Sequence, residues 1–110
     1  MQQTDLGLNL STKRTRKREF LAQMDSVVPW DDLVAVVAPY SRQSKTGRPP
    51  FAVLTMLRIH FMQQWFTLSD PAMEEALHDI ALFREFAGLS LGDRLPDEST
   101  ILRFRHLLDK

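Results

Sequence analysis

Apolar residues recur at helical spacing along most of the chain. Five segments place apolar side chains three and four residues apart, which is typical of helices with one buried face. They cover about residues 17–28, 30–39, 51–66, 70–88 and 97–108. No stretch alternates apolar and polar residues as a strand does. The pattern therefore predicts an all-α fold, a compact bundle of about five helices, with a helix-turn-helix-like arrangement as one form of it.

Helix signals at the ends of these segments support their limits. Asp31 and Asp32 lie in the first turn of the second segment, where acidic residues favour the helix dipole. We expect Asp70 to be the N-cap of the fourth segment, with Pro71 at its first helical position. Gly88 suits a left-handed C-cap. The segment at 51–66 is apolar around most of its circumference, so we expect it to be central and buried.

The chain has the length of one domain, and its composition is that of a globular protein. It has 110 residues, of which 44% are hydrophobic and 25% are charged, and it has no cysteine. The absence of cysteine excludes disulfides and zinc–thiolate sites. We expect residues 1–18 to be a basic, mobile arm and residues 19–110 to be the helical domain. We also expect a cytoplasmic protein, since the apolar segment 51–66 contains Arg58 and His60 and is too short to span a membrane.

Charge is unevenly distributed along the chain. Residues 1–60 have nine Lys or Arg and five Asp or Glu, whereas residues 61–110 have five and nine. The resulting charges of +4 and −4 indicate an anionic partner for the first half. The basic side chains that we expect to contact DNA lie in the arm, in the proline-rich segment 39–50 and in the last helix: Lys13, Arg14, Arg16, Lys17, Arg18, Arg42, Lys45, Arg48, Arg103 and Arg105. A solvated run of charge is the alternative for residues 13–18.

Enzyme chemistry finds little support in the residue pattern. Glu75 and His78 have the spacing found in di-iron helix bundles, but neither His60 nor His106 has a glutamate three residues before it. The chain has no glycine-rich phosphate loop, and no pairing of a nucleophile with a base is apparent. We therefore expect no catalytic residue, no metal site and no cofactor in this chain.

A set of short motifs resembles the N-terminal domain of bacterial insertion-sequence transposases of the "insertion sequence five" type, which belong to the DDE class. The resemblance runs from about Trp30 to the last residue and rests on the order and spacing of these motifs: Gly47-Arg48-Pro49-Pro50, Met56-Leu57, Gln64-Trp65, Leu68-Ser69-Asp70, Glu74-Glu75-Ala76, Phe83, Phe86, Gly88, Pro96-Asp97 and Phe104-Arg105-His106.

The resemblance implies a helical module that precedes a ribonuclease-H-like catalytic domain. In that family the catalytic domain carries the metal-binding carboxylates and is expected to use a divalent metal such as magnesium. We expect those carboxylates to lie beyond residue 110, so that this chain is not itself an enzyme. The expected partner is double-stranded DNA at the terminal inverted repeats of the element, in a bacterial, nucleoid-associated setting with no membrane contact.

Two further roles remain open from the sequence. The apolar residues of the last helix, which include Ile101, Phe104 and Leu108, need a partner surface. A homodimer or a contact with a transposase catalytic domain would supply it. A truncated inhibitor of the full-length transposase is a related possibility.

Overall fold

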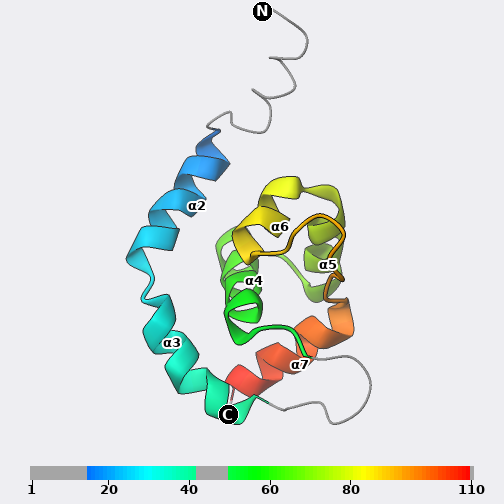
Figure 1. Ribbon diagram of the computed structural model, residues 1–110. Coiled ribbons are helices and arrows are strands. Elements are labelled where there is room, and N and C mark those ends of the chain that lie inside the picture. Colours follow the sequence, from blue (N-terminus) through cyan, green and yellow to red (C-terminus); the bar gives the residue numbers. More distant parts are fainter. Residues whose placement is uncertain (1–14, 42–49, 110) are drawn as a thin grey trace, which may run out of the picture.

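The protein is described here by a computed structural model, whose described residues are 15–41 and 50–109. These residues form six α-helices and one short 3-10 helix, without strands, which confirms the all-α prediction. Figure 1 shows α2 and α3 along one side of a group made by α4 to α7. The elements are α2 (Arg16–Val27), α3 (Trp30–Val37), η1 (Ala38–Tyr40), α4 (Val53–Phe66), α5 (Asp70–Asp79), α6 (Ala81–Ala87) and α7 (Glu98–Leu108).

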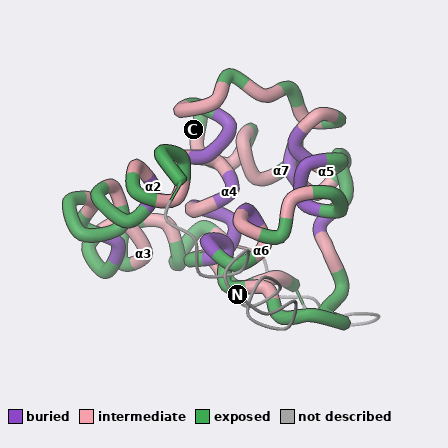
Figure 2. Tube along the Cα trace, turned by 90° about the horizontal axis from the view of Figure 1, so that it is seen from above, coloured by how far each residue is buried: buried purple, intermediate pink, exposed green. Residues whose placement is uncertain are grey.

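The core forms around α4, as its apolar circumference predicts. Ile59 and Met62 of this helix are fully buried. Helices α5, α6 and α7 cover them with Leu77, Phe83 and Ile101, each at most 2% exposed. Figure 2 shows the buried residues gathered mainly on α4 to α7, whereas most of α2 and α3 is exposed or half-buried. Burial of such side chains, at about 1.5–3 kcal/mol each, is the main stabilising contribution.

Helix α2 is attached to this core through a few side chains. Leu21 is 2% exposed. The ring of Phe20 meets those of Trp65 and Phe66 edge-on, at centroid distances of 5.5 and 5.8 Å. Pro29 then separates α2 from α3, because proline has no N–H to continue the helical ladder.

The sequence predicted one helix over residues 70–88, and this prediction is wrong in one respect, because the structure has two helices there, α5 and α6. Ile80 is extended, with φ −117° and ψ 104°, and separates α5 from α6. The guanidinium of Arg84 donates to the carbonyls of Leu77 and His78 at 2.6 and 2.9 Å, and so satisfies two of the last acceptors of α5. The sequence contains no glycine or proline at this break, and the helical spacing of apolar residues continues across Ile80. Gly88, at φ 83°, ends α6 as predicted.

Two predicted boundaries also move. Helix α2 begins at Arg16, one residue before the start that the periodicity predicted, so residues 16–18 are helical; the hydroxyl of Thr15 caps the helix by accepting from the Arg18 N–H at 3.1 Å. The N-cap of α5 is Ser69 and not Asp70, since the Ser69 hydroxyl accepts from the Ala72 N–H. The carboxylate of Asp70 has other partners, described below.

The helix-turn-helix part of the prediction is not confirmed. For α6 and α7, the connection formed by residues 88–97 is longer than the three or four residues of such a turn, so these two helices do not form the motif. Among the described residues, no helix is both long and apolar enough to cross a membrane.

Candidate nucleic-acid interface

The predicted DNA-contacting residues fall into two separate places in the described part of the chain. Three of them form the first turn of α2, and two lie on α7, which begins on the other side of the core (Figure 1). The structure does not bring these two groups together. The remaining predicted contacts lie outside the described residues: Lys13, Arg14, Arg42, Lys45 and Arg48.

The first turn of α2 combines two features that attract phosphate. Its free backbone N–H groups give the helix N-terminus a partial positive charge, and the first three residues of the helix are all basic: Arg16, Lys17 and Arg18. Arg16 is exposed. The ammonium of Lys17 lies over the rings of Phe66 and Phe83, 5.4 and 5.3 Å from their centroids, a cation–π arrangement.

Arg18 is already paired within the protein. Its two terminal nitrogens donate to the two carboxylate oxygens of Glu85, at 3.1 and 3.2 Å. This is the fork geometry in which arginine also binds phosphate. Arg18 is 22% exposed and Glu85 is 61% exposed, so the pair lies at the surface between α2 and α6.

Arg105 has a structural role on α7. Its guanidinium donates to the carboxylate of Asp70 at 2.7 Å, and the same carboxylate accepts from the side-chain amide of Gln63 at 2.9 Å. These bonds join α7, α5 and α4. The hydrogen bond from Arg105 is the main reason why the pKa of Asp70 lies below its ordinary value. The predicted contact of Arg105 with DNA stays a prediction.

This pairing makes acid stability testable. Because the pKa of Asp70 is lowered in the folded state, its contribution is present above the ordinary carboxyl pKa of about 4 and is lost as pH falls through the folded value. The Asp70→Asn variant should be less stable than the parent at pH 7 by about 1–3 kcal/mol. The difference between the two proteins should narrow toward pH 2. Urea unfolding at several pH values measures this, and a difference independent of pH would contradict it.

Arg103 faces solvent on α7. Its side chain is exposed, and its guanidinium lies 3.5 Å from the hydroxyl of Thr100, one turn earlier on the same helix. The opposite face of α7 is turned inward. Ile101 is buried, and Phe104 and Leu108 pack against the core. These three residues therefore have a partner surface within the described chain. Their burial does not require a dimer, although the sequence suggested one for this purpose.

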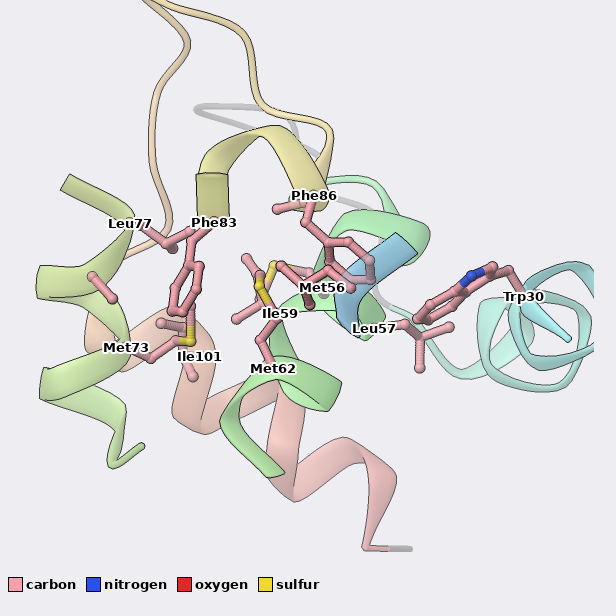
Figure 3. Packing of buried hydrophobic residues seen from close by; sticks show 13 residues of the cluster. Trp30, Met56, Leu57, Ile59, Met62, Met73, Leu77, Phe83, Phe86 and Ile101 are labelled. Carbon is pink, nitrogen blue, oxygen red and sulfur yellow. The ribbon is translucent and has the colours of Figure 1, made fainter. Parts of the chain in front are cut away.

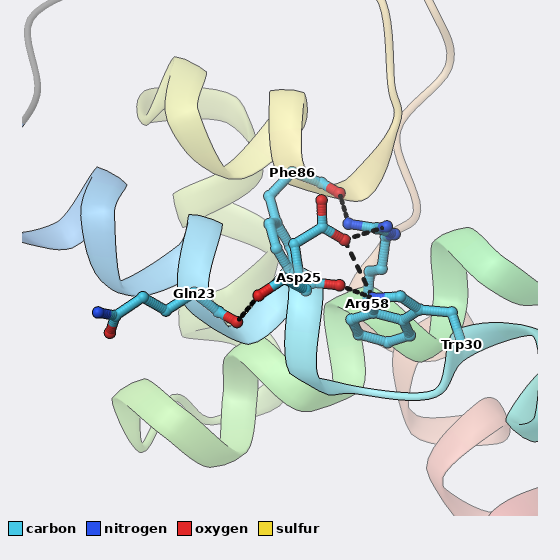
Figure 4. Close-up of polar contacts among 6 residues, drawn as sticks. Gln23, Asp25, Trp30, Arg58 and Phe86 are labelled. Atoms are coloured by element: carbon cyan, nitrogen blue, oxygen red, sulfur yellow. Dashed lines mark hydrogen bonds and ion pairs between the residues drawn. The ribbon is translucent and has the colours of Figure 1, made fainter.

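Arg58 of α4 contacts three neighbouring helices, a role that was not predicted from the sequence. Figure 4 shows it between α2, α3 and α6. One nitrogen donates to Asp25 at 2.6 Å, and another donates to the carbonyl of Phe86 at 3.1 Å. The guanidinium also stacks over the rings of Trp30 and Phe86, at 4.6 and 4.7 Å. The available signal was that Arg58 is the only Lys, Arg, Asp or Glu in the mainly apolar segment 51–66.

Asp25 completes this cluster. Its carboxylate accepts from Arg58 and also from the indole N–H of Trp30, the latter at 3.0 Å. The cluster therefore fixes the angle between α2 and α3 and joins both helices to α4. Arg58 is 16% exposed, which makes it more suited to holding helices than to reaching DNA.

Two buried side-chain atoms of α4, Nδ1 of His60 and Oε1 of Gln63, have no hydrogen-bond partner among residues 15–41 and 50–109. Burial lowers the pKa of His60, and the nearby Arg105 lowers it further. Glu75 and His78, the pair considered for a metal, are both exposed. Within the described ranges, no three acidic or histidine side chains are grouped so that they could hold a metal ion.

Several residues of the transposase-like motifs hold helix junctions in this structure. Ser69 and Asp97 are the N-caps of α5 and α7. The carboxylate of Glu74 accepts from the backbone N–H of Glu98 at 2.8 Å and so joins α5 to the start of α7. These motif positions thus contribute to the junctions between helices.

The chain matches a protein-family model over nearly its whole length. The model of a transposase domain (DUF772) matches residues 8–107. No solved structure matches the chain.

Proposed function

The chain belongs to the transposase domain family (DUF772), which matches residues 8–107, and from this membership we propose that it is the DNA-binding N-terminal module of an insertion-sequence transposase. The membership itself gives the chain a transposase-related role. The finer proposal is that the module is of the "insertion sequence five" type and holds the terminal inverted repeats of its element during transposition.

The observation that carries this proposal is the first turn of α2. A helix that begins with Arg16, Lys17 and Arg18 is suited to binding the phosphates of a duplex. Lys13 and Arg14 come immediately before it in the sequence and add two further positive charges. On α7, Arg103 is the exposed candidate for contact with base edges.

In this proposal, cutting and joining of DNA belong to a separate catalytic domain that uses a divalent metal such as magnesium. The present chain supplies binding and orientation and has no cofactor of its own. Double-stranded DNA in the bacterial cytoplasm is the proposed partner. A dimer or a contact with the catalytic domain is compatible with this role.

The proposal predicts how charge removal changes DNA affinity. Replacing Lys13, Arg14 and Arg16 together with alanine should weaken binding about equally for an inverted-repeat duplex and for a scrambled duplex. It should also make the dependence of log affinity on log salt less steep by about 2.7, since each neutralised phosphate contributes about 0.9. Fluorescence anisotropy of labelled duplexes at several salt concentrations measures both quantities.

Arg103→Ala serves as the matched comparison. If Arg103 contacts a base edge, this single change should reduce the preference for the repeat over the scrambled duplex and change the salt slope by less than the triple variant does. Equal affinity of the parent and the triple variant for both duplexes would remove these three side chains from the interface. Absence of binding by the parent chain would overturn the proposed function.

A further inference from the structure

The Arg18–Glu85 pair has a geometry that bears on DNA binding. Glu85 presents two oxygens to the two terminal nitrogens of Arg18, at 3.1 and 3.2 Å. A phosphate group binds a guanidinium through the same two nitrogens. The carboxylate of Glu85 therefore occupies the position on Arg18 that a DNA phosphate would take.

From this geometry we propose that Glu85 is a built-in competitor of DNA for Arg18, and that it lowers the affinity of the first turn of α2 for nucleic acid. The inference rests on the proposed DNA-binding function. In the free protein the charge of Arg18 is neutralised by Glu85, and Arg16 and Lys17 remain to attract the duplex. On binding, a phosphate displaces the carboxylate, which is already 61% exposed and returns to water.

The fold permits this exchange because α2 does not depend on the pair for its position. Leu21 of the same helix is 2% exposed. Phe20 packs against Trp65 and Phe66, and Asp25 is bound to Arg58 at 2.6 Å. An ion pair at the surface contributes little to stability, so breaking it leaves the helix in place.

The surroundings of Glu85 also support an exchangeable contact. Arg84, the adjacent residue, is turned toward α5, where it donates to the carbonyls of Leu77 and His78. Lys17 lies over Phe66 and Phe83. Neither Arg84 nor Lys17 therefore binds the Glu85 carboxylate in the contacts given above, whereas Arg18 binds it through both terminal nitrogens.

The test compares five proteins by anisotropy with one labelled duplex at low salt: the parent, Glu85→Gln, Arg18→Ala, the variant with both changes, and Glu75→Gln. Glu75 is the charge-matched control, since it is exposed on α5, away from α2 (Figure 1). Glu85→Gln should bind about three- to fivefold more tightly than the parent, and Glu75→Gln less than twofold. In the Arg18→Ala background, the gain from Glu85→Gln should disappear.

Other outcomes overturn the inference in distinguishable ways. A gain that persists without Arg18, or that Glu75→Gln reproduces, would show a general effect of charge. Weaker binding by Glu85→Gln would show that the carboxylate orients Arg18 for DNA. If the parent binds DNA and Glu85→Gln equals it, the competition is absent while the proposed function stands. If the parent binds no DNA, the competition by Glu85 and the proposed DNA-binding function are both contradicted. Thermal unfolding verifies that each variant is folded, and Glu85→Ala replaces the glutamine variant if that one is not.

Discussion

Replacement of Arg58 by alanine is expected to lower the free energy of unfolding by about 2–4 kcal/mol. The change removes the donors to Asp25 and to the Phe86 carbonyl, which are bound at 2.6 and 3.1 Å. It also removes the stacking on the rings of Trp30 and Phe86. Hydrogen bonds to a charged group are stronger than neutral ones, and the Phe86 carbonyl would lose this donor.

Chemical unfolding in urea measures this loss, and Arg103→Ala is the matched control. Both variants lose one arginine, but Arg103 is exposed on α7, so its removal should change stability by less than about 0.5 kcal/mol. Arg58→Lys should recover only part of the loss, because an ammonium cannot stack as a planar guanidinium does. Equal stability of Arg58→Ala and Arg103→Ala would contradict the structural role of the cluster.

Replacement of Phe83 by alanine should have the largest effect, about 3–5 kcal/mol. Phe83 is 2% exposed, and its ring stacks on Phe66 at a centroid distance of 5.2 Å. Figure 3 shows the ring directed from α6 into the cluster that includes Met73 and Ile101. Its removal leaves a cavity between three helices and takes away one of the two rings below the Lys17 ammonium.

A loss of this size is a large part of the 5–15 kcal/mol that holds a typical domain together. The urea midpoint should therefore fall markedly. Leu91→Ala is the control, since Leu91 is 95% exposed and contributes little to the core. If Phe83→Ala unfolds at the same urea concentration as the control, the core described for α4 to α7 is wrong.

The sequence predicted those parts of the fold that follow from local pattern. The burial of α4 followed from an apolar circumference, and the start of α3 followed from the acidic residues in its first turn. The break at Ile80 could not be predicted in this way, because it depends on Arg84 reaching back to the carbonyls of α5. Local periodicity contains no information about such a tertiary contact.

The candidate site shows the same limit. Sequence spacing identified basic residues, but it could not distinguish an arginine that faces solvent from one that is already bound. Arg16 and Arg103 are exposed, whereas Arg18 and Arg105 are paired with acids 67 and 35 residues away. Only the packing of α2 on α6, and of α7 on α5, reveals those pairs.

The placement of the two tryptophans has a consequence for optical studies of this protein. Trp65 lies edge-on to Phe20 of α2 at 5.5 Å, and the indole N–H of Trp30 is held by Asp25 of the same helix. The fluorescence of both tryptophans therefore depends on the contact between α2 and the rest of the protein. Their emission would register departure of α2 even where α5 and α7 stayed packed, and a signal from the α5–α7 side would need an added label.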